Sequence, residues 1–375
     1  MNNFKHLKKK IYCSLLFFYV MLSIIIPAFF LNKVIFIILM TLYCFDKMFF
    51  NRVLKNKIIA PVAIFGIYTY GVYIALFSDV DYILLKQLYL ATLPLFLIYI
   101  IKDYKIEYDK IILQAGKYFL MLSLLLTYLF EKKYFPNILD FFMKYSLIGR
   151  GYRQFGSLSL FMFHLGTVPF VYLLFCIFLM NFKQNKIKNI FWMVISVVVC
   201  LLSTSRALIF AIVLYTLYFL LTNVRKKYKI LLYICIILGF FISVSIVLKY
   251  TTILSTNEYG NSIKLKHIIS YFKILSWKNL IFGNGLGTVY FSYGVNKSVA
   301  QTEVTLIDLL RYFGVLFTSL LYYFMYFPSM NLKISKKKNE FIIFSIYLIM
   351  SLTNPILLNS FGVLIILWYW SKKDI

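Results

Sequence analysis

The sequence has few charged residues, and those few are unbalanced in sign. Only 14% of its 375 residues are charged, with 13 Asp and Glu against 40 Lys and Arg, whereas 62% are hydrophobic. Soluble domains carry about 25% charged and about 45–50% apolar residues. A soluble fold of this length has too little interior to bury so much apolar surface. The composition therefore excludes an ordinary soluble protein and predicts that a lipid bilayer surrounds most of the chain.

Cysteine is scarce and is placed where it forms neither disulfides nor metal sites. All five cysteines lie in apolar segments, with no metal-ligand spacing and no pair in loops. We therefore expect no metal ion. No small-residue cleavage site follows Pro27 in the first apolar stretch, which favours an uncleaved first span over a removed signal peptide.

Long apolar runs predict membrane-spanning helices. A helix needs roughly 20 apolar residues to cross about 30 Å of hydrocarbon. Clear spans are expected at residues 58–77, 83–101, 111–130, 157–180, 190–204, 207–222, 230–250 and 302–327. Two further regions, 11–45 and 341–370, are interrupted, the first at Asn32 and Lys33 and the second at Pro355.

The positions of the basic residues predict the orientation of the spans. More than half of the 40 Lys and Arg fall in seven short clusters, at residues 5–10, 47–57, 102–110, 183–188, 225–229, 333–338 and 372–373. Basic loops stay in the cytoplasm, and placing all seven clusters there requires two passes in each interrupted region. Because these basic residues lie between apolar segments, we expect no nucleic acid as a partner.

The predicted fold is an all-α, polytopic integral membrane protein, with residues 1–375 forming a single transmembrane domain. We expect about 12 transmembrane helices, or roughly 10–14 if short pieces are re-entrant, with both termini cytoplasmic. Two large extracytoplasmic loops then follow, at residues 131–156 and 251–301. The apolar stretch 268–275 in the second loop is expected to form an interfacial helix.

Ionisable residues within spans are costly and so mark candidate sites. If residues 301–314 form a helix, Glu303 and Arg311 share one face, and Asp308 and Arg311 are spaced to pair. Glu303 has no partner nearby in the sequence, which favours a functional role. For Asp308 and Arg311, substrate binding and a buried structural ion pair stay open alternatives.

Three arginines in or beside the predicted outer loops are candidate phosphate ligands. Arg206 follows Ser203-Thr204-Ser205, and its guanidinium and these hydroxyls suit phosphate oxygens. Arg150 and Arg153 lie among glycines just before a predicted span, where they are accessible to a diphosphate at the membrane surface. The alternatives are an arginine that extends to the membrane interface and a solvated basic loop.

The remaining motifs are weaker. The segment 282–287, Phe-Gly-Asn-Gly-Leu-Gly, lacks dinucleotide-binding spacing and favours close backbone packing over ligand contact. His164 lies in an apolar run and suits a packing role. His267 lies in the second outer loop, where it is a candidate base or substrate ligand.

Three of these features together resemble the bacterial O-antigen and capsule polymerase and O-antigen ligase superfamily (Wzy-like proteins). They are Ser203 to Arg206 opening a span, the long outer loop with the 282–287 motif, and the span from Glu303 to Gly314. The resemblance covers roughly residues 145–326. Ligases of this superfamily usually carry His-Asn eleven residues before the matched glycine, where this chain has Glu303-Val304, which favours a polymerase. The paired Arg-x10-Gly motifs of some polymerases are absent.

The resemblance implies an enzyme of the bacterial inner membrane that needs neither a metal nor any other cofactor. Such an enzyme moves a glycan from an undecaprenyl-diphosphate-linked oligosaccharide to an acceptor hydroxyl, building O-antigen, capsule or exopolysaccharide. A chain-length regulator and a flippase are the protein partners that it implies. In this reading Arg206, with Arg150 or Arg153, neutralises the leaving diphosphate, and Glu303 takes the proton of the attacking hydroxyl.

Other activities remain open. A flippase for the same lipid-linked sugars should have repeat-related halves and short loops, and neither pattern is visible in this sequence. A ligase is disfavoured by Glu303. An acyltransferase would need a nucleophile or an intramembrane histidine base, for which His164 is the candidate.

Overall fold

The computed structural model describes residues 2–27, 30–49, 59–155, 158–223, 259–326, 338–357 and 359–372. The described chain is mainly helical, as the sequence predicts. Its first part comprises α1 (Asn2–Ile25), α2 (Leu31–Phe49), α3 (Ala60–Ala75), α4 (Tyr82–Leu90), the 3-10 helix η1 (Leu93–Phe96), α5 (Leu97–Asp103), α6 (Tyr108–Glu131) and α7 (Pro136–Lys144). The predicted span 230–250 and the basic cluster 225–229 lie outside the described residues.

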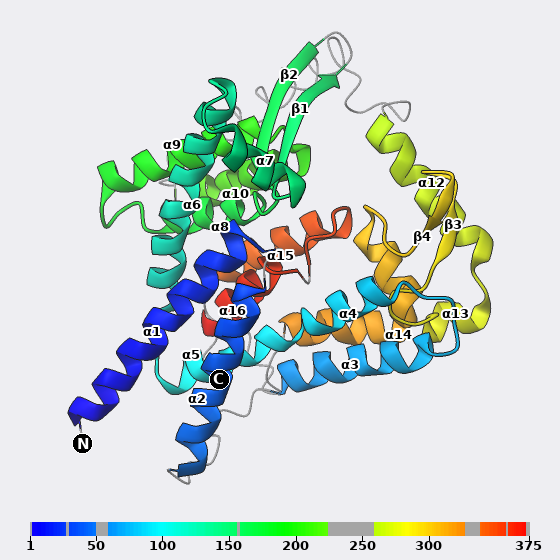
Figure 1. Ribbon diagram of the computed structural model, residues 1–375, viewed down its shortest axis with the longest axis horizontal. Helices are drawn as coiled ribbons and strands as arrows, with labels where there is room; N and C mark the ends of the chain where they lie inside the picture. The colour runs from blue at the N-terminus through cyan, green and yellow to red at the C-terminus, as the bar shows by residue number, and fades with distance from the viewer. Residues whose placement is uncertain are drawn as a thin grey trace.

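The rest of the chain contains two short antiparallel hairpins among its helices. Its elements are β1 (Ile148–Phe155), β2 (Leu158–Leu165), α8 (Phe170–Met180), α9 (Lys186–Leu202), α10 (Arg206–Asn223), α12 (Tyr259–Ile274), α13 (Trp277–Phe282), β3 (Tyr290–Ser292), β4 (Lys297–Val299), α14 (Thr305–Tyr326), α15 (Lys338–Leu352) and α16 (Gly362–Lys372). In Figure 1 the first hairpin projects at the top, whereas α12, α13 and the second hairpin lie at the right.

Several helices are long and apolar enough to cross a membrane. Within the described ranges there are four such stretches, Tyr82–Asp103, Tyr108–Glu131, Arg206–Asn223 and Thr305–Tyr326, and each coincides with a predicted span. Two shorter apolar helices, Ala60–Ala75 and Phe170–Met180, accompany them. By length and composition these helices identify a helical membrane protein.

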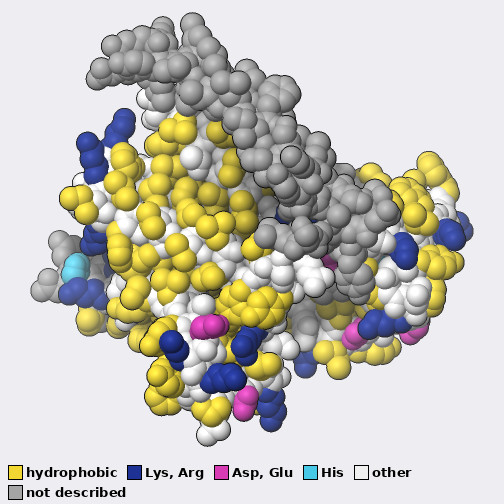
Figure 2. All heavy atoms as spheres, turned by 90° about the horizontal axis from the view of Figure 1, so that it is seen from above, with side chains coloured by type: hydrophobic (Ala, Val, Ile, Leu, Met, Phe, Trp, Pro, Cys, Tyr) yellow, Lys and Arg dark blue, Asp and Glu magenta, His cyan; other side chains and the backbone are white. Residues whose placement is uncertain are grey.

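The surface of the molecule supports the same conclusion. Large apolar side chains such as Phe77 (76% exposed), Ile83 (74%) and Leu76 (70%) lie open on it. Figure 2 shows apolar side chains over much of the described surface of one face, with Lys and Arg gathered in small groups. A water-soluble monomer rarely exposes so much contiguous apolar surface, whereas a lipid-facing one must.

Both interrupted regions, where two passes were predicted, contain two helices, although none of these four helices is among the candidate spans of the described residues. The first break follows Ile25, next to Pro27, and not at Asn32 and Lys33, which lie in the first turn of α2. The second break falls between α15 and α16, where Asn354 and Pro355 were expected to interrupt the span. Proline cannot continue a helix because it lacks the backbone donor, whereas a polar residue in the first turn costs little.

The predicted helical span 157–180 is wrong in its first part. Leu158–Leu165 forms β2 and pairs with β1, so the end of the predicted loop 131–156 is also a strand, and α7 occupies its middle. The helix begins only at Phe170, and every residue of α8 from Phe170 to Leu179 is buried. A helix that is apolar on all sides packs in the interior of the protein. The apolar run that predicted a span is therefore explained by burial of α8 among other helices.

Ion pairs connect helix ends at one side of the bundle. The pairs are Lys8–Asp46 between α1 and α2, Lys47–Asp103 between α2 and α5, and Lys372–Asp109 between α16 and α6. The Trp368 indole also donates to Asp109, at 2.7 Å. Described members of four predicted basic clusters are therefore brought to the same end of the molecule, among them Lys8, Lys47 and Lys372.

The second predicted outer loop is folded from residue 259 onward. We call α12, α13, β3 and β4 the α12–β4 unit, and the expected helix over 268–275 is the second half of α12. The glycine-rich turn of the unit is held by backbone hydrogen bonds, from Leu286 to Gly71 in α3 and from Gly285 to Tyr312 in α14. A Cβ on Gly285, whose φ is +100°, would collide with the backbone of Ala75. The packing interpretation of this motif is thus confirmed.

Candidate functional site

The first hairpin positions two of the predicted arginines. In the β1–β2 register Arg150 faces Phe163 across the ladder and Arg153 faces Leu160. Residues three apart on a strand point to opposite faces. Arg150 is exposed, and its guanidinium lies over the ring of Phe130 in α6, 5.1 Å from the centroid. Arg153 is half-buried and points instead toward the turn between α9 and α10.

This turn carries the Ser203 to Arg206 motif. Thr204 has a left-handed backbone, with φ +49°, and its carbonyl accepts a hydrogen bond from Arg153 Nη1 at 3.3 Å. The Ser203 hydroxyl donates to the carbonyl of Cys200 at 2.6 Å and accepts from the Ser205 amide at 3.3 Å. Two motifs about 50 positions apart therefore meet, because the fold brings Arg153 beside the helix that Arg206 opens.

The junction is chemically suited to an anion. Arg206 is half-buried at the start of α10, a helix of 18 residues whose first amides and dipole favour negative charge. The hydroxyl of Thr204 is buried and has no hydrogen-bond partner among the described residues. Guanidinium groups and a helix N-terminus are donors of the kind that bind phosphate oxygens, and the buried Thr204 hydroxyl lies in the same turn. We call Arg153, Ser203, Thr204 and Arg206 the arginine junction.

His164 lies close to this junction, which the sequence did not indicate. It belongs to β2, in register with Gly149, and its ring occupies the space over that glycine. A Cβ at position 149 would lie 2.5 Å from His164 Nε2, so glycine is needed there. Burial and then the charge of Arg153 lower the pKa of His164, which favours a neutral imidazole. The predicted packing role fits its surroundings, although its element is a strand and not a span.

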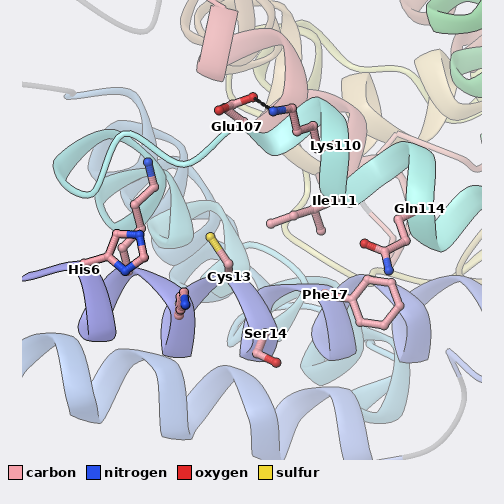
Figure 3. A pocket seen from close by; sticks show the side chains of 10 residues that line it. His6, Cys13, Ser14, Phe17, Glu107, Lys110, Ile111 and Gln114 are labelled. Carbon is pink, nitrogen blue, oxygen red and sulfur yellow. Dashed lines mark ion pairs between the residues drawn. The ribbon is translucent and has the colours of Figure 1, made fainter. Parts of the chain in front are cut away.

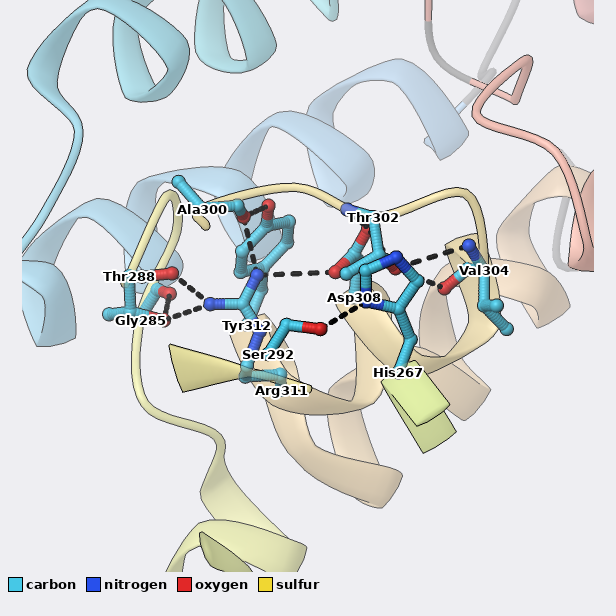
Figure 4. Close-up of polar contacts among 10 residues, drawn as sticks. All are labelled: His267, Gly285, Thr288, Ser292, Ala300, Thr302, Val304, Asp308, Arg311 and Tyr312. Carbon is cyan, nitrogen blue, oxygen red and sulfur yellow. Dashed lines mark hydrogen bonds and ion pairs between the residues drawn. The ribbon is translucent and has the colours of Figure 1, made fainter. Parts of the chain in front are cut away.

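The second group of candidates surrounds Arg311 in α14. This side chain is fully buried, with its guanidinium between the rings of Tyr290 and Tyr312, 4.6 Å and 4.7 Å from their centroids. Its terminal nitrogens donate to the carbonyls of Thr288 and Ala300 (Figure 4). Arg311 thus connects α14 to the segments on either side of the second hairpin.

Asp308 completes this cluster. Its carboxylate lies 3.2 Å from Arg311 Nη2 and accepts from the Thr302 amide at 2.7 Å and the Thr302 hydroxyl at 3.2 Å. Of the two alternatives for these residues, the geometry is that of the buried structural ion pair. Both partners are held by protein groups, so the pair fixes the end of the α12–β4 unit against α14.

Glu303 is not on the helical face that the sequence indicated. α14 begins at Thr305, so Glu303 precedes the helix and does not share a face with Arg311. Its side chain is 58% exposed, and its carboxylate lies 3.9 Å from Lys264 Nζ in α12. The prediction from spacing was wrong because it assumed a helix from residue 301, whereas α14 begins at Thr305. Glu303 is accessible, as a base acting on a substrate must be.

His267 lies in the interior of the α12–β4 unit. It is 3% exposed, and its Nδ1 is 2.5 Å from the Ser292 hydroxyl in β3. Burial lowers the pKa of His267, although the nearby charges of Asp308 and Glu303 oppose that change. These contacts are those of a packed interior residue.

A comparison of the chain with protein-family models, curated proteins and solved structures finds no match. Within the described part of the chain, no group of three or more His, Cys, Asp or Glu side chains could hold a metal ion. The predicted residues therefore separate into a half-buried arginine junction, a fully buried Arg311 cluster, and Glu303, which is exposed and lies near α12.

Proposed function

We propose that the protein polymerises oligosaccharide repeat units carried on undecaprenyl diphosphate, at the outer face of the bacterial inner membrane. The observation that carries this proposal is the hydrogen bond from Arg153 to the Thr204 carbonyl. It places a second guanidinium beside the turn that holds Arg206, where a diphosphate needs compensating charge.

In the proposed reaction the acceptor hydroxyl attacks the anomeric carbon of the donor sugar. The bond between this carbon and the diphosphate oxygen breaks, and undecaprenyl diphosphate leaves with the bonding electrons. Arg206 and Arg153 neutralise the charge that develops on the leaving group. Glu303 accepts the proton of the attacking hydroxyl. Diphosphate release requires no cofactor, since the departing group is already stabilised as an anion.

The proposal includes about 12 spans with both termini in the cytoplasm. It is supported by the basic end of the bundle, where α1, α2, α5, α6 and α16 meet through ion pairs. α6 begins there and has 24 residues, so its other end lies roughly 36 Å away, enough to cross the hydrocarbon. α7 and the first hairpin follow that far end, and this direction supports an extracytoplasmic location for the arginine junction.

The decisive experiment compares polysaccharide ladders from the bacterium carrying Arg206→Ala or Glu303→Gln. We expect each variant to lose long polymer and retain a single repeat unit, with normal amounts of protein in the membrane. Removing one donor to a developing oxyanion typically costs about 10²–10³ in rate. Glu131→Gln, which removes another exposed carboxylate, is the matched control and should leave the ladder unchanged.

Two further results bear on the assignment. Arg153→Ala should impair polymerisation more than Arg150→Ala, because only Arg153 contacts the Thr204 turn. Loss of all surface glycan, including the single unit, would indicate a flippase or a ligase instead. Reporter fusions that place Arg206 and Glu303 on opposite sides of the membrane would refute the shared site.

A further inference from the structure

A groove lies between α1 and α6, at the ion-paired end of the bundle and far along α6 from the first hairpin. It has a volume of about 480 Å³, within the roughly 300–1,000 Å³ typical of sites for small organic ligands. Figure 3 shows residues of both helices lining it. Neither the arginine junction nor the Arg311 cluster contributes to this lining.

One end of the groove is strongly basic. Lys9, Lys10 and Lys110 line it together with His6, against a single carboxylate, Glu107. Lys9 Nζ donates to the carbonyl of Lys105 at 2.9 Å, which holds this ammonium at the rim. Lys110 lies 2.5 Å from Glu107, and this hydrogen bond lowers the pKa of the Glu107 carboxyl. The three ammonium groups therefore leave an excess of two positive charges at the rim.

The charge of the groove falls along its length. Beyond the charged rim the lining residues are uncharged, from Cys13, Ser14 and Ile111 to Phe17 and Gln114, which lie side by side (Figure 3). On α1 the step from His6 to Phe17 is eleven residues, or roughly 16 Å at the rise of an α-helix. A ligand that fills this groove has an anionic head and a longer, less polar body.

We propose that this groove binds an anionic phospholipid, with its phosphate between Lys9, Lys10 and Lys110 and its glycerol and first acyl carbons toward Phe17. Basic pockets between transmembrane helices near the cytoplasmic surface have the charge and depth that such headgroups need. The lipid would stabilise the contact of α1 with α6 in the leaflet where the basic clusters lie. This proposal requires a membrane location but does not depend on polymerase chemistry.

The test uses the full-length protein in mixed vesicles of phosphatidylglycerol and phosphatidylcholine, with native mass spectrometry to count the lipids that remain bound. We expect wild type to retain phosphatidylglycerol selectively. The variant Lys9→Gln/Lys10→Gln/Lys110→Gln should bind it about a hundredfold more weakly, since each lysine contributes about fivefold near an anionic lipid. The matched control Lys132→Gln/Lys133→Gln/Lys144→Gln makes the same charge change at exposed positions after the far end of α6 and should behave as wild type.

A variant with the opposite effect guards against simple loss of folding. Glu107→Gln removes the competing carboxylate and should increase retention of phosphatidylglycerol. Competition identifies the source of the phosphate: inorganic phosphate at millimolar concentration should not displace the lipid, because it cannot fill the apolar part of the groove. Equal loss in the two triple variants, or full displacement by inorganic phosphate, would overturn the assignment.

Discussion

Arg311 and Arg153 are both arginines, but their environments in the protein are opposite. Arg311 is fully buried between two tyrosine rings and pairs with Asp308 in the same helix. Arg153 projects from a hairpin, is half-buried, and contacts a turn in which Ser203 and Thr204 are buried. A buried guanidinium whose terminal nitrogens are held by the protein stabilises the fold, whereas a half-buried one can be reached by a ligand. From the sequence alone, both residues were candidate substrate ligands.

Among the substitutions considered, Arg311→Met should have the largest effect on stability. This change leaves Asp308 buried without its cation, and loss of one partner of a buried pair costs about 3–5 kcal/mol. We expect a large fall in the melting temperature of the purified protein. Tryptophan fluorescence in detergent measures this temperature. The double variant Arg311→Met/Asp308→Leu should recover part of the loss, because no buried charge remains.

Arg153→Gln is the matched partner in that experiment. It should lower the melting temperature less than Arg311→Met, since Arg153 is half-buried and leaves no buried carboxylate unpaired, while it impairs polymer formation. Equal destabilisation by Arg311→Met and Arg153→Gln would contradict the distinction between a structural and a functional arginine.

Gly285→Ala should have an intermediate effect. The φ of +100° is unfavourable for any side chain, and the added methyl would meet the backbone of Ala75 in α3. We expect a loss of about 1–3 kcal/mol in the free energy of unfolding, measured in detergent and urea. Gly66→Ala is the control, because a Cβ at Gly66 has no atom within 4 Å and alanine favours the helix. A stable Gly285→Ala protein would show that the α12–β4 unit is not seated on α3 in this way.

The smallest expected effect concerns pH. Burial lowers the pKa of His267 below its usual 6.5, so the unfolded chain takes up this proton more readily than the folded one. Stability is therefore complete above about pH 6.5 and falls as the pH drops toward the folded value, by up to about 1.4 kcal/mol per pH unit. The melting temperature should decline as the pH falls below about 6.5, and less steeply in His267→Gln. His164→Gln should retain the His267 contribution to that slope.

Much of the helical architecture was predictable because lipid-facing and interior helices need long apolar runs. α6 was expected at 111–130 and is observed at Tyr108–Glu131. The first hairpin was missed because its second strand continues directly into the apolar run that becomes α8. The pair Gly156-Ser157, which is typical of two-residue turns, was the available signal.

The site was predictable in its residue types but not in its contacts. Ser203 to Arg206 was identified from its hydroxyls and guanidinium, yet nothing in the local pattern indicated Arg153 as a neighbour. The start of α14 could have been predicted, because Thr305-Leu-Ile-Asp308 has the spacing of a capping box. That reading would have excluded Glu303 from the helix. No local sequence pattern indicated that Lys264 lies near Glu303.

The pairing of Asp109 with α16 has a consequence for biosynthesis. Asp109 lies at the start of α6, whereas its partners Trp368 and Lys372 are made 259 or more positions later. A ribosome therefore releases α6 into the bilayer long before the carboxylate gains its cation. Until α16 arrives, Asp109 lacks these two partners, so a chain truncated before α16 cannot form the ion pair and the hydrogen bond that join the two helices in the completed protein.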